Sequence, residues 1–313
     1  MTQLRVVFFG TPEFAVPSLQ ALLDGHDDIV AAICQPDKPA GRGQHMAASP
    51  VKQLAIDRGL RVLQPQKLRT PEAFDELTDL HPDLIVVAAY GKILPPNILA
   101  LPRLGCINVH ASLLPKYRGA APIQWAILRG ETMTGVTIMQ MNEGMDTGDI
   151  LLQRDTAIGD TETYGQLQTR LSHLGAASLM QAIGLLKQGE LHPRPQDNQA
   201  ATLAPLIRKD DGRLDWTRPA VELVRAVRAF NPWPSAQTTL DGALLKIHRA
   251  RVVSDISGIS GSPGTLQIRD DTIVVACGSG ALRLEQLQLA GRKALSAGEF
   301  LRGARVKTGT QLR

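Results

Sequence analysis

Asn108 and His110 are the side chains whose types and spacing could do chemistry together. They belong to the short apolar run Cys106–His110, where β-branched residues alternate with polar ones. On a strand, side chains two positions apart leave the same face, so Asn108 and His110 point together while Ile107 and Val109 pack behind them. An amide that donates hydrogen bonds and an imidazole that exchanges protons can stabilise a developing negative charge.

Asp146 is the third candidate, and it follows a later predicted strand, residues 136–141. Gly144 and Gly148 flank it, which suits a tight turn that presents one carboxylate. Such a carboxylate can fix the tautomer of His110 or order a water beside it. Taken alone, however, a histidine at the end of a strand is most often a hydrogen-bonded structural residue.

The elements that must position these residues follow an α/β pattern. Apolar runs that predict strands cover residues 4–9, 29–34 and 83–89. Three pairs of a capping residue and a proline predict helix starts at Thr11-Pro12, Ser49-Pro50 and Thr70-Pro71. Strands that alternate with capped helices predict a doubly wound, Rossmann-like parallel sheet, which binds ligands outside the carboxyl ends of its strands.

Length and composition predict two domains. The chain has 313 residues, of which 43% are hydrophobic and 20% charged, an ordinary balance for a globular protein but a long chain for one core. We expect a catalytic domain over residues 1–189, a proline-containing linker over 190–207 and a smaller domain over 208–313. About five short β-like runs in the last domain predict an OB-like barrel, with a different β-barrel as the alternative.

Charge is distributed unevenly between these regions. Residues 208–313 carry 17 basic and 10 acidic side chains, a net +7, whereas residues 1–207 carry 17 and 20, a net −3. A polyanion bound by the C-terminal third is the simplest interpretation. A basic surface that only favours solubility is the alternative.

Several classes of protein are disfavoured. No run of about 18 apolar residues could span a membrane. Cys34, Cys106 and Cys277 are isolated and the histidines are scattered, so neither a disulfide framework nor a metal site is expected. The first βα turn lacks the G-x-G-x-x-G pattern of dinucleotide sites. We expect a cytoplasmic monomer.

The stretch Gly105–Trp125 resembles the central motif of the 10-formyltetrahydrofolate-dependent formyltransferases, Asn-x-His-x-Ser-Leu-Leu-Pro-x-Tyr-Arg-Gly. The resemblance covers essentially the full chain. It implies that Asn108, His110 and Asp146 are catalytic. We expect His110 to stabilise the oxyanion of a tetrahedral intermediate and to transfer a proton, with Asn108 as the second donor. It also implies 10-formyltetrahydrofolate as co-substrate, with no metal. The folate would lie along the folate-binding residues Ser112, Leu113, Leu114 and Pro115.

Three further features resemble the branch of the family that formylates initiator methionyl-tRNA. They are the first turn Phe9–Phe14, the loop Gln35–Gly43, which is similar to an insertion that contacts the acceptor stem, and the C-terminal stretch Arg225–Pro234. The implied tRNA contacts are Lys38, Arg42, Lys209, Arg225, Arg228 and Lys246. The loop departs from the family pattern at Gln44 and His45, where further basic residues are common.

Three other interpretations stay open. The chain could be a folate-dependent formyltransferase or hydrolase for a small amine or a nucleotide-sugar, which the basic loop and the C-terminal charge disfavour. It could be a non-catalytic RNA-binding protein with the α/β half as a scaffold. It could also use Ser112 as a covalent nucleophile, although the G-x-S-x-G elbow is missing.

Overall fold

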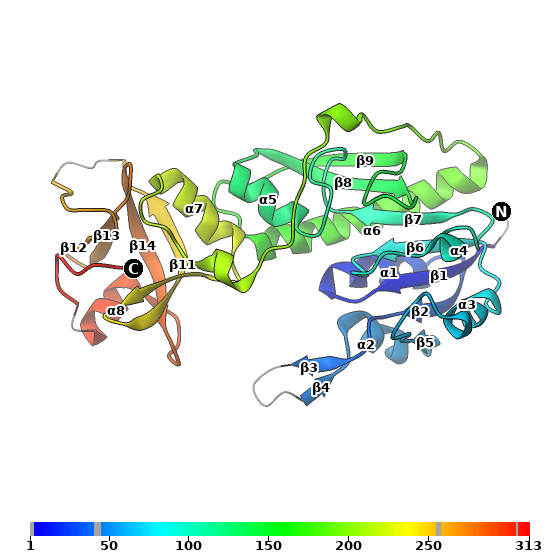
Figure 1. The fold of residues 1–313 in the computed structure, drawn as a ribbon, viewed down its shortest axis with the longest axis horizontal. Helices are drawn as coiled ribbons and strands as arrows, with labels where there is room; N and C mark the ends of the chain where they lie inside the picture. The colour runs from blue at the N-terminus through cyan, green and yellow to red at the C-terminus, as the bar shows by residue number, and fades with distance from the viewer. Residues whose placement is uncertain (1–2, 41–44, 255–257, 305) are drawn as a thin grey trace. The chain divides into compact units, whose positions relative to one another are not determined.

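The computed structural model describes residues 3–40, 45–254, 258–304 and 306–313 (Figure 1). The chain divides into two compact units. The first unit comprises residues 1–122, 133–157 and 168–205, and the second comprises residues 123–132, 158–167 and 206–313.

A seven-stranded sheet forms the centre of the first unit, in the order β5-β2-β1-β6-β7-β8-β9. Its strands are β1 (Arg5–Gly10), β2 (Asp28–Ile33), β5 (Val62–Leu63), β6 (Leu84–Ala88), β7 (Cys106–His110), β8 (Met133–Gln140) and β9 (Ile150–Ala157). The first five strands of that order are parallel, which confirms the predicted α/β class with its mostly parallel sheet. β8 pairs antiparallel with both β7 and β9. The turn between β8 and β9 is too short for the crossover that a parallel pair needs.

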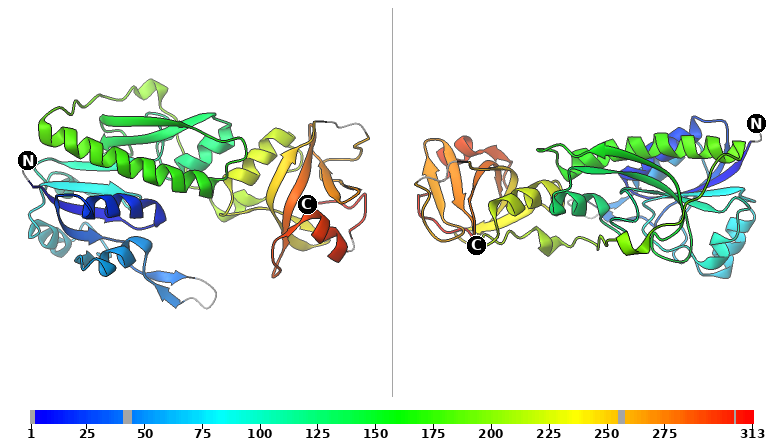
Figure 2. Two further views of the ribbon diagram at one scale, coloured as in Figure 1. Left: turned by 180° about the vertical axis from the view of Figure 1, so that it is seen from behind. Right: turned by 90° about the horizontal axis from the view of Figure 1, so that it is seen from above.

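Helices cover both faces of this sheet. They are α1 (Val16–Leu23), α2 (Pro50–Asp57), α3 (Pro71–Thr78), α4 (Pro96–Leu99) and α6 (Tyr164–Gln188). Figure 2 shows α1 and α6 on one face, and the side chains of α3 and α4 share a buried cluster with Val7, Ile85 and Val87 on the other. Side chains along β1, β6 and β7 are buried almost without interruption, because the sheet has a core on each side.

Two of the three predicted helix starts are confirmed by their caps. The Ser49 hydroxyl accepts from the Lys52 backbone N–H and the Thr70 hydroxyl from that of Ala73. Thr11 is different: its hydroxyl accepts from the Gln35 backbone N–H, and a short 3₁₀ turn, Glu13–Ala15, precedes α1. Its side chain thus ties the first turn to the end of β2 instead of capping a helix.

The second unit consists of an antiparallel sheet and helices of its own. Its main path runs β10-β11-β14-β13-β12, with β15 paired to β14. The elements are α5 (Pro122–Arg129), α7 (Ala220–Ala229), β10 (Ala236–Leu240), β11 (Ala243–Val252), β12 (Leu266–Arg269), β13 (Thr272–Ala276), β14 (Ala281–Leu289), β15 (Leu295–Ser296) and α8 (Ala297–Gly303). Residues 310–313 hydrogen-bond to Leu266 and Gly264 on one side and to Thr239 on the other. They thereby join the two edges of the sheet into a barrel, as the sequence predicts.

Two segments outside the main sheets contain or contact the predicted site residues. β3 (Lys38–Ala40) and β4 (His45–Ala47) pair as a two-stranded ribbon. Residues 196–204, expected as part of a linker, are bound to the first unit: Arg118 and Leu203 form a bridge, and the Tyr117 N–H donates to the Thr202 hydroxyl at 2.9 Å. Over the described ranges, no helix is both long and apolar enough to cross a membrane.

Candidate active site

β7 points Asn108 and His110 to the same face of the sheet, as predicted. In the register, Asn108 stands between Val87 of β6 and Met139 of β8, and Val87 belongs to the core under α3 and α4. Val109 leaves the opposite face, where its Cγ1 lies so close to Gly175 of α6 that an added Cβ would be 2.8 Å away. The pair therefore sits at the carboxyl end of a central strand.

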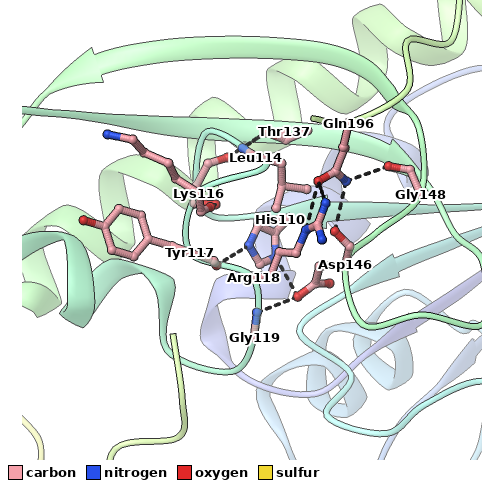
Figure 3. A network of polar contacts seen from close by, with 11 residues as sticks. His110, Leu114, Lys116, Tyr117, Arg118, Gly119, Thr137, Asp146, Gly148 and Gln196 are labelled. Atoms are coloured by element: carbon pink, nitrogen blue, oxygen red, sulfur yellow. Dashed lines mark hydrogen bonds and ion pairs between the residues drawn. The ribbon is translucent and has the colours of Figure 1, made fainter. Parts of the chain in front are cut away.

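The imidazole of His110 is buried, with 6% of its surface exposed. Its Nε2 lies 3.0 Å from the backbone carbonyl oxygen of Tyr117. A carbonyl oxygen can only accept, so Nε2 carries the hydrogen. Nδ1 is then the unprotonated nitrogen of the neutral ring, and it faces Oδ2 of Asp146 at 3.6 Å (Figure 3).

Asp146 is held in a turn by contacts to both its side chain and its backbone. Its φ is +52°, a left-handed conformation that is uncommon outside glycine. Its Oδ2 accepts from the Gly119 N–H at 2.8 Å, and its carbonyl oxygen accepts from Nε2 of Gln196 at 2.9 Å. A Cβ on Gly148 would lie 1.8 Å from the Gln140 carbonyl oxygen, so this glycine permits the turn that the sequence predicted.

The predicted folate-binding stretch, Ser112 to Pro115, is only partly open. Ser112 is buried and its hydroxyl donates to the Lys116 carbonyl oxygen at 2.6 Å. Leu114 is 3% exposed and packs with Met139 and Ile150. Leu113 and Pro115 are half-buried and present the accessible side chains of the stretch. Because the Ser112 hydroxyl is bound to a carbonyl instead of to His110, the geometry offers no relay for a covalent serine mechanism.

The predicted RNA-contacting residues fall into three groups. Lys38, at the start of β3, and Lys209 are exposed, and Lys246 on β11 is half-buried. Arg42 lies outside the described residues. Arg225 and Arg228 on α7 contact other parts of the second unit.

Arg225 and Arg228 pack against their own unit. Nη1 of Arg228 donates to the Gly159 carbonyl oxygen at 3.0 Å, while its Nε is buried without a partner in the described part of the chain. Burial, and to a lesser extent the charge of Arg225, lowers the pKa of Arg228. The Arg225 guanidinium lies directly on Gly130, where a Cβ would be 2.2 Å from Cζ. It also lines a cleft of about 590 Å³, together with Trp125 and other side chains of the second unit.

Neither metal nor disulfide chemistry is visible in the described ranges. No group of three His, Cys, Asp or Glu side chains there could hold a metal ion. Cys34, Cys106 and Cys277 are buried free thiols. Burial raises the pKa of these thiols, to about 11, about 12 and about 11 respectively.

Three side chains of the site were missed by the sequence analysis. Thr137 lies opposite His110 in the β7–β8 register, and its hydroxyl donates to the Ser112 carbonyl oxygen. Arg118 and Gln196 connect to Asp146 through hydrogen bonds. Pairing of residues 136–141 with the strand of His110 could have indicated Thr137, but no local pattern marks Gln196.

Comparison with known proteins agrees with this fold. The chain matches the family model for formyl transferase over residues 4–183 and that for the formyl transferase C-terminal domain over residues 206–305. The chain therefore belongs to the formyl transferase family and is a formyl-transfer enzyme, which confirms the resemblance of its central motif.

Full-length relatives of about 50% identity are named methionyl-tRNA formyltransferase. The methionyl-tRNA formyltransferase of Stutzerimonas stutzeri is 54% identical, over 97% of this chain and 96% of its own. That of Myxococcus xanthus is 52% identical, over 99% and 98%. Among solved structures, HypX from Aquifex aeolicus in complex with tetrahydrofolic acid superposes with a TM-score of 0.63 at 19% identity, over 97% of this chain and 48% of HypX. That identity shows a shared fold alone.

Proposed function

We propose that the chain transfers the formyl group of 10-formyltetrahydrofolate to the free α-amino group of methionine on initiator methionyl-tRNA, for translation initiation. The observation that carries the proposal is the contact between His110 and Asp146, with Asn108 two residues before His110 on β7. Full-length relatives named methionyl-tRNA formyltransferase support the amine acceptor. The family match and the tetrahydrofolic acid bound to HypX support the donor.

The reaction requires one proton to move. The amine nitrogen forms a bond to the formyl carbon, the bond from that carbon to N10 breaks, and the proton lost by the amine ends on N10. Because Nε2 of His110 carries a hydrogen for the Tyr117 carbonyl, Nδ1 is the ring atom that can take this proton. The Asp146 carboxylate faces Nδ1 at 3.6 Å, where it orients the ring towards the proton to be moved. Return of the proton from Nδ1 to N10 leaves the ring unchanged.

Asn108 suits the role of oxyanion donor. Its side chain is half-buried on β7, and it has no hydrogen-bond partner in the described ranges. Both amide hydrogens are therefore available to a negative oxygen that develops in the transition state. Donors aimed at such an oxygen are typically worth about 10²–10³ in rate.

The two substrates draw on different parts of the chain. For the folate, Leu113 and Pro115 offer accessible apolar surface, and backbone groups of residues 112–115 would supply the polar contacts. For the tRNA, Lys38, Lys209 and Lys246 present charge that is accessible to phosphates. Contacts of this kind make affinity fall steeply with salt.

The decisive test is single-turnover formylation of methionyl-tRNA by Asn108→Ala, His110→Ala and Asp146→Ala. Each rate is expected to fall about 10²–10³-fold, with unchanged circular dichroism and melting temperature as the control for folding. Near wild-type rates in all three folded variants would overturn the catalytic assignment. Ser112→Ala is the matched hydroxyl control, because a covalent serine mechanism predicts complete loss whereas this proposal predicts a modest effect.

Acceptor identity needs a separate measurement. We expect kcat/KM for methionyl-tRNA to exceed that for free methionine, or for an amino-sugar nucleotide, by several orders of magnitude. Comparable values for a small amine would support the alternative of a formyltransferase or hydrolase with another substrate. We also propose that the enzyme works as a cytoplasmic monomer without a metal, which sedimentation and activity in the presence of a chelator would test.

A further inference from the structure

Backbone groups of Tyr117 and Gly119 hold the two proton-handling side chains, His110 and Asp146. The Tyr117 carbonyl oxygen accepts from Nε2 of His110 at 3.0 Å, and the Gly119 N–H donates to Oδ2 of Asp146 at 2.8 Å. Between them, the Arg118 side chain turns towards Gln196 (Figure 3). Its Nε and Nη2 donate to Oε1 of Gln196 at 3.1 and 2.7 Å.

Gln196 passes this contact on to the backbone of the Asp146 turn. Its Nε2 donates to the carbonyl oxygens of Asp146, at 2.9 Å, and Gly148, at 2.6 Å. Among residues 192–200, Gln196 alone is half-buried while the other side chains are exposed. One amide group thus uses its oxygen for Arg118 and its nitrogen for the turn.

The conformation of Asp146 needs such support. Its φ of +52° lies in the left-handed region, which is unfavourable for residues other than glycine. It persists where neighbouring groups hold the peptide in place. The two bonds from Gln196 hold the carbonyl oxygens on both ends of the Asp146–Gly148 segment, and Arg118, itself 8% exposed, fixes the plane of the Gln196 amide.

We propose that Gln196 is a positioning residue for formyl transfer, which holds the Asp146 turn so that the carboxylate faces Nδ1 of His110. Arg118 orients Gln196 and has no contact with the reacting atoms. The inference rests on the proposed role of Asp146. If Gln196 has this role, residues 190–207, which were expected to be a linker, contribute a side chain to the proposed active site of the first unit.

The test is a double-mutant cycle between Gln196 and Asp146. Gln196→Ala is expected to lower the single-turnover rate about 10–100-fold, since a small displacement of a catalytic group can cost about 10²-fold. The same substitution in an Asp146→Asn background is expected to change the residual rate less than twofold, because the group that it positions is already gone. Equal losses in both backgrounds would overturn the proposal.

Gln196→Glu separates the two halves of the contact. A carboxylate still accepts from Arg118 but cannot donate to the Asp146 and Gly148 carbonyl oxygens. We expect its rate to match that of Gln196→Ala while the melting temperature stays near wild type. A Gln196→Glu enzyme with the wild-type rate would contradict the positioning role.

A readout that does not depend on activity completes the design. In Gln196→Ala the ring ¹⁵N resonances of His110 should move in the same direction as in Asp146→Asn. In the double variant Gln196→Ala/Asp146→Asn these resonances should move no further than in Asp146→Asn alone. Gln267→Ala is the matched control, because Gln267 is equally a glutamine that donates to a backbone carbonyl, that of Ser260, at 2.6 Å, but lies in the second unit. It should change neither the resonances nor the rate. Full activity in Asp146→Asn would refute the proposed function itself. Equal losses from Gln196→Ala in the wild-type and in an impaired Asp146→Asn background would refute this inference alone.

Discussion

The end of β7 in the first unit and α7 in the second both carry polar side chains at regular spacing, yet the two regions use them differently. Around β7, backbone groups of Tyr117 and Gly119 hold His110 and Asp146, so that Nδ1 of His110 remains directed at the carboxylate. On α7, Arg228 donates to the Gly159 carbonyl. What distinguishes a reactive site from a supporting one is which atoms stay available after the protein has satisfied its own hydrogen bonds.

Alanine substitutions of one glycine in each region should give the largest difference in single-turnover rate between the two regions. Gly119 has a φ of +123°, and a Cβ there would lie 2.7 Å from the Ala204 carbonyl oxygen, a backbone atom that cannot easily move. Gly119→Ala should therefore displace its N–H from Asp146 and lower the single-turnover rate about 10²-fold. At Gly130 of the second unit the clash is with the end of the flexible Arg225 side chain.

Gly130→Ala is thus the matched control. Its φ of +74° makes the substitution cost about 1–2 kcal/mol of stability, but we expect the rate of formyl transfer to stay within about threefold of wild type. Both variants are checked by thermal melting and single-turnover kinetics. Equal rate losses in the two variants would remove the contrast between the regions.

Neutralisation of single charges should separate bound from available basic residues. Arg228→Ala removes an internal hydrogen bond and is expected to lower stability by about 1–3 kcal/mol, with little change in how RNA affinity depends on salt. Lys209→Ala removes an exposed charge, so it should leave the melting temperature unchanged and reduce the salt slope by about 1. Titrations of tRNA at several salt concentrations measure both effects. The interpretation fails if Arg228→Ala reduces the slope and Lys209→Ala does not.

Local patterns in the sequence predicted much of the fold and the shared face of Asn108 and His110. Period-two alternation placed Asn108 and His110 on one face because a strand fixes the directions of its side chains. The caps at Ser49 and Thr70 were predictable for the same reason, since a cap depends on residues only three positions apart. Thr11 has the same local pattern, but a contact to the distant Gln35 decided its role.

Long-range contacts account for the parts that the sequence did not predict. Gln196 lies in a polar, proline-containing segment, and nothing near it in the chain indicates that its amide reaches Asp146, 50 positions earlier. The net charge of residues 208–313 predicted a basic region but not that Arg228 is partly buried. Availability of a side chain depends on tertiary packing, which composition does not specify.

The smallest expected effect is a difference in alkylation rate between Cys106 of the first unit and Cys277 of the second. Burial raises the pKa of Cys106 to about 12 and of Cys277 to about 11, from an ordinary value of 9.0. At pH 8 the thiolate fraction of each native thiol is thus about 10⁻³ or below, and Cys277 should be alkylated about tenfold faster than Cys106. As the pH rises above 9 the unfolded chain ionises first, so both thiols subtract from stability until the pH reaches their folded pKa. Mass spectrometry of iodoacetamide adducts in native protein measures the ratio, and faster modification of Cys106 would show that the first unit opens more readily than the second.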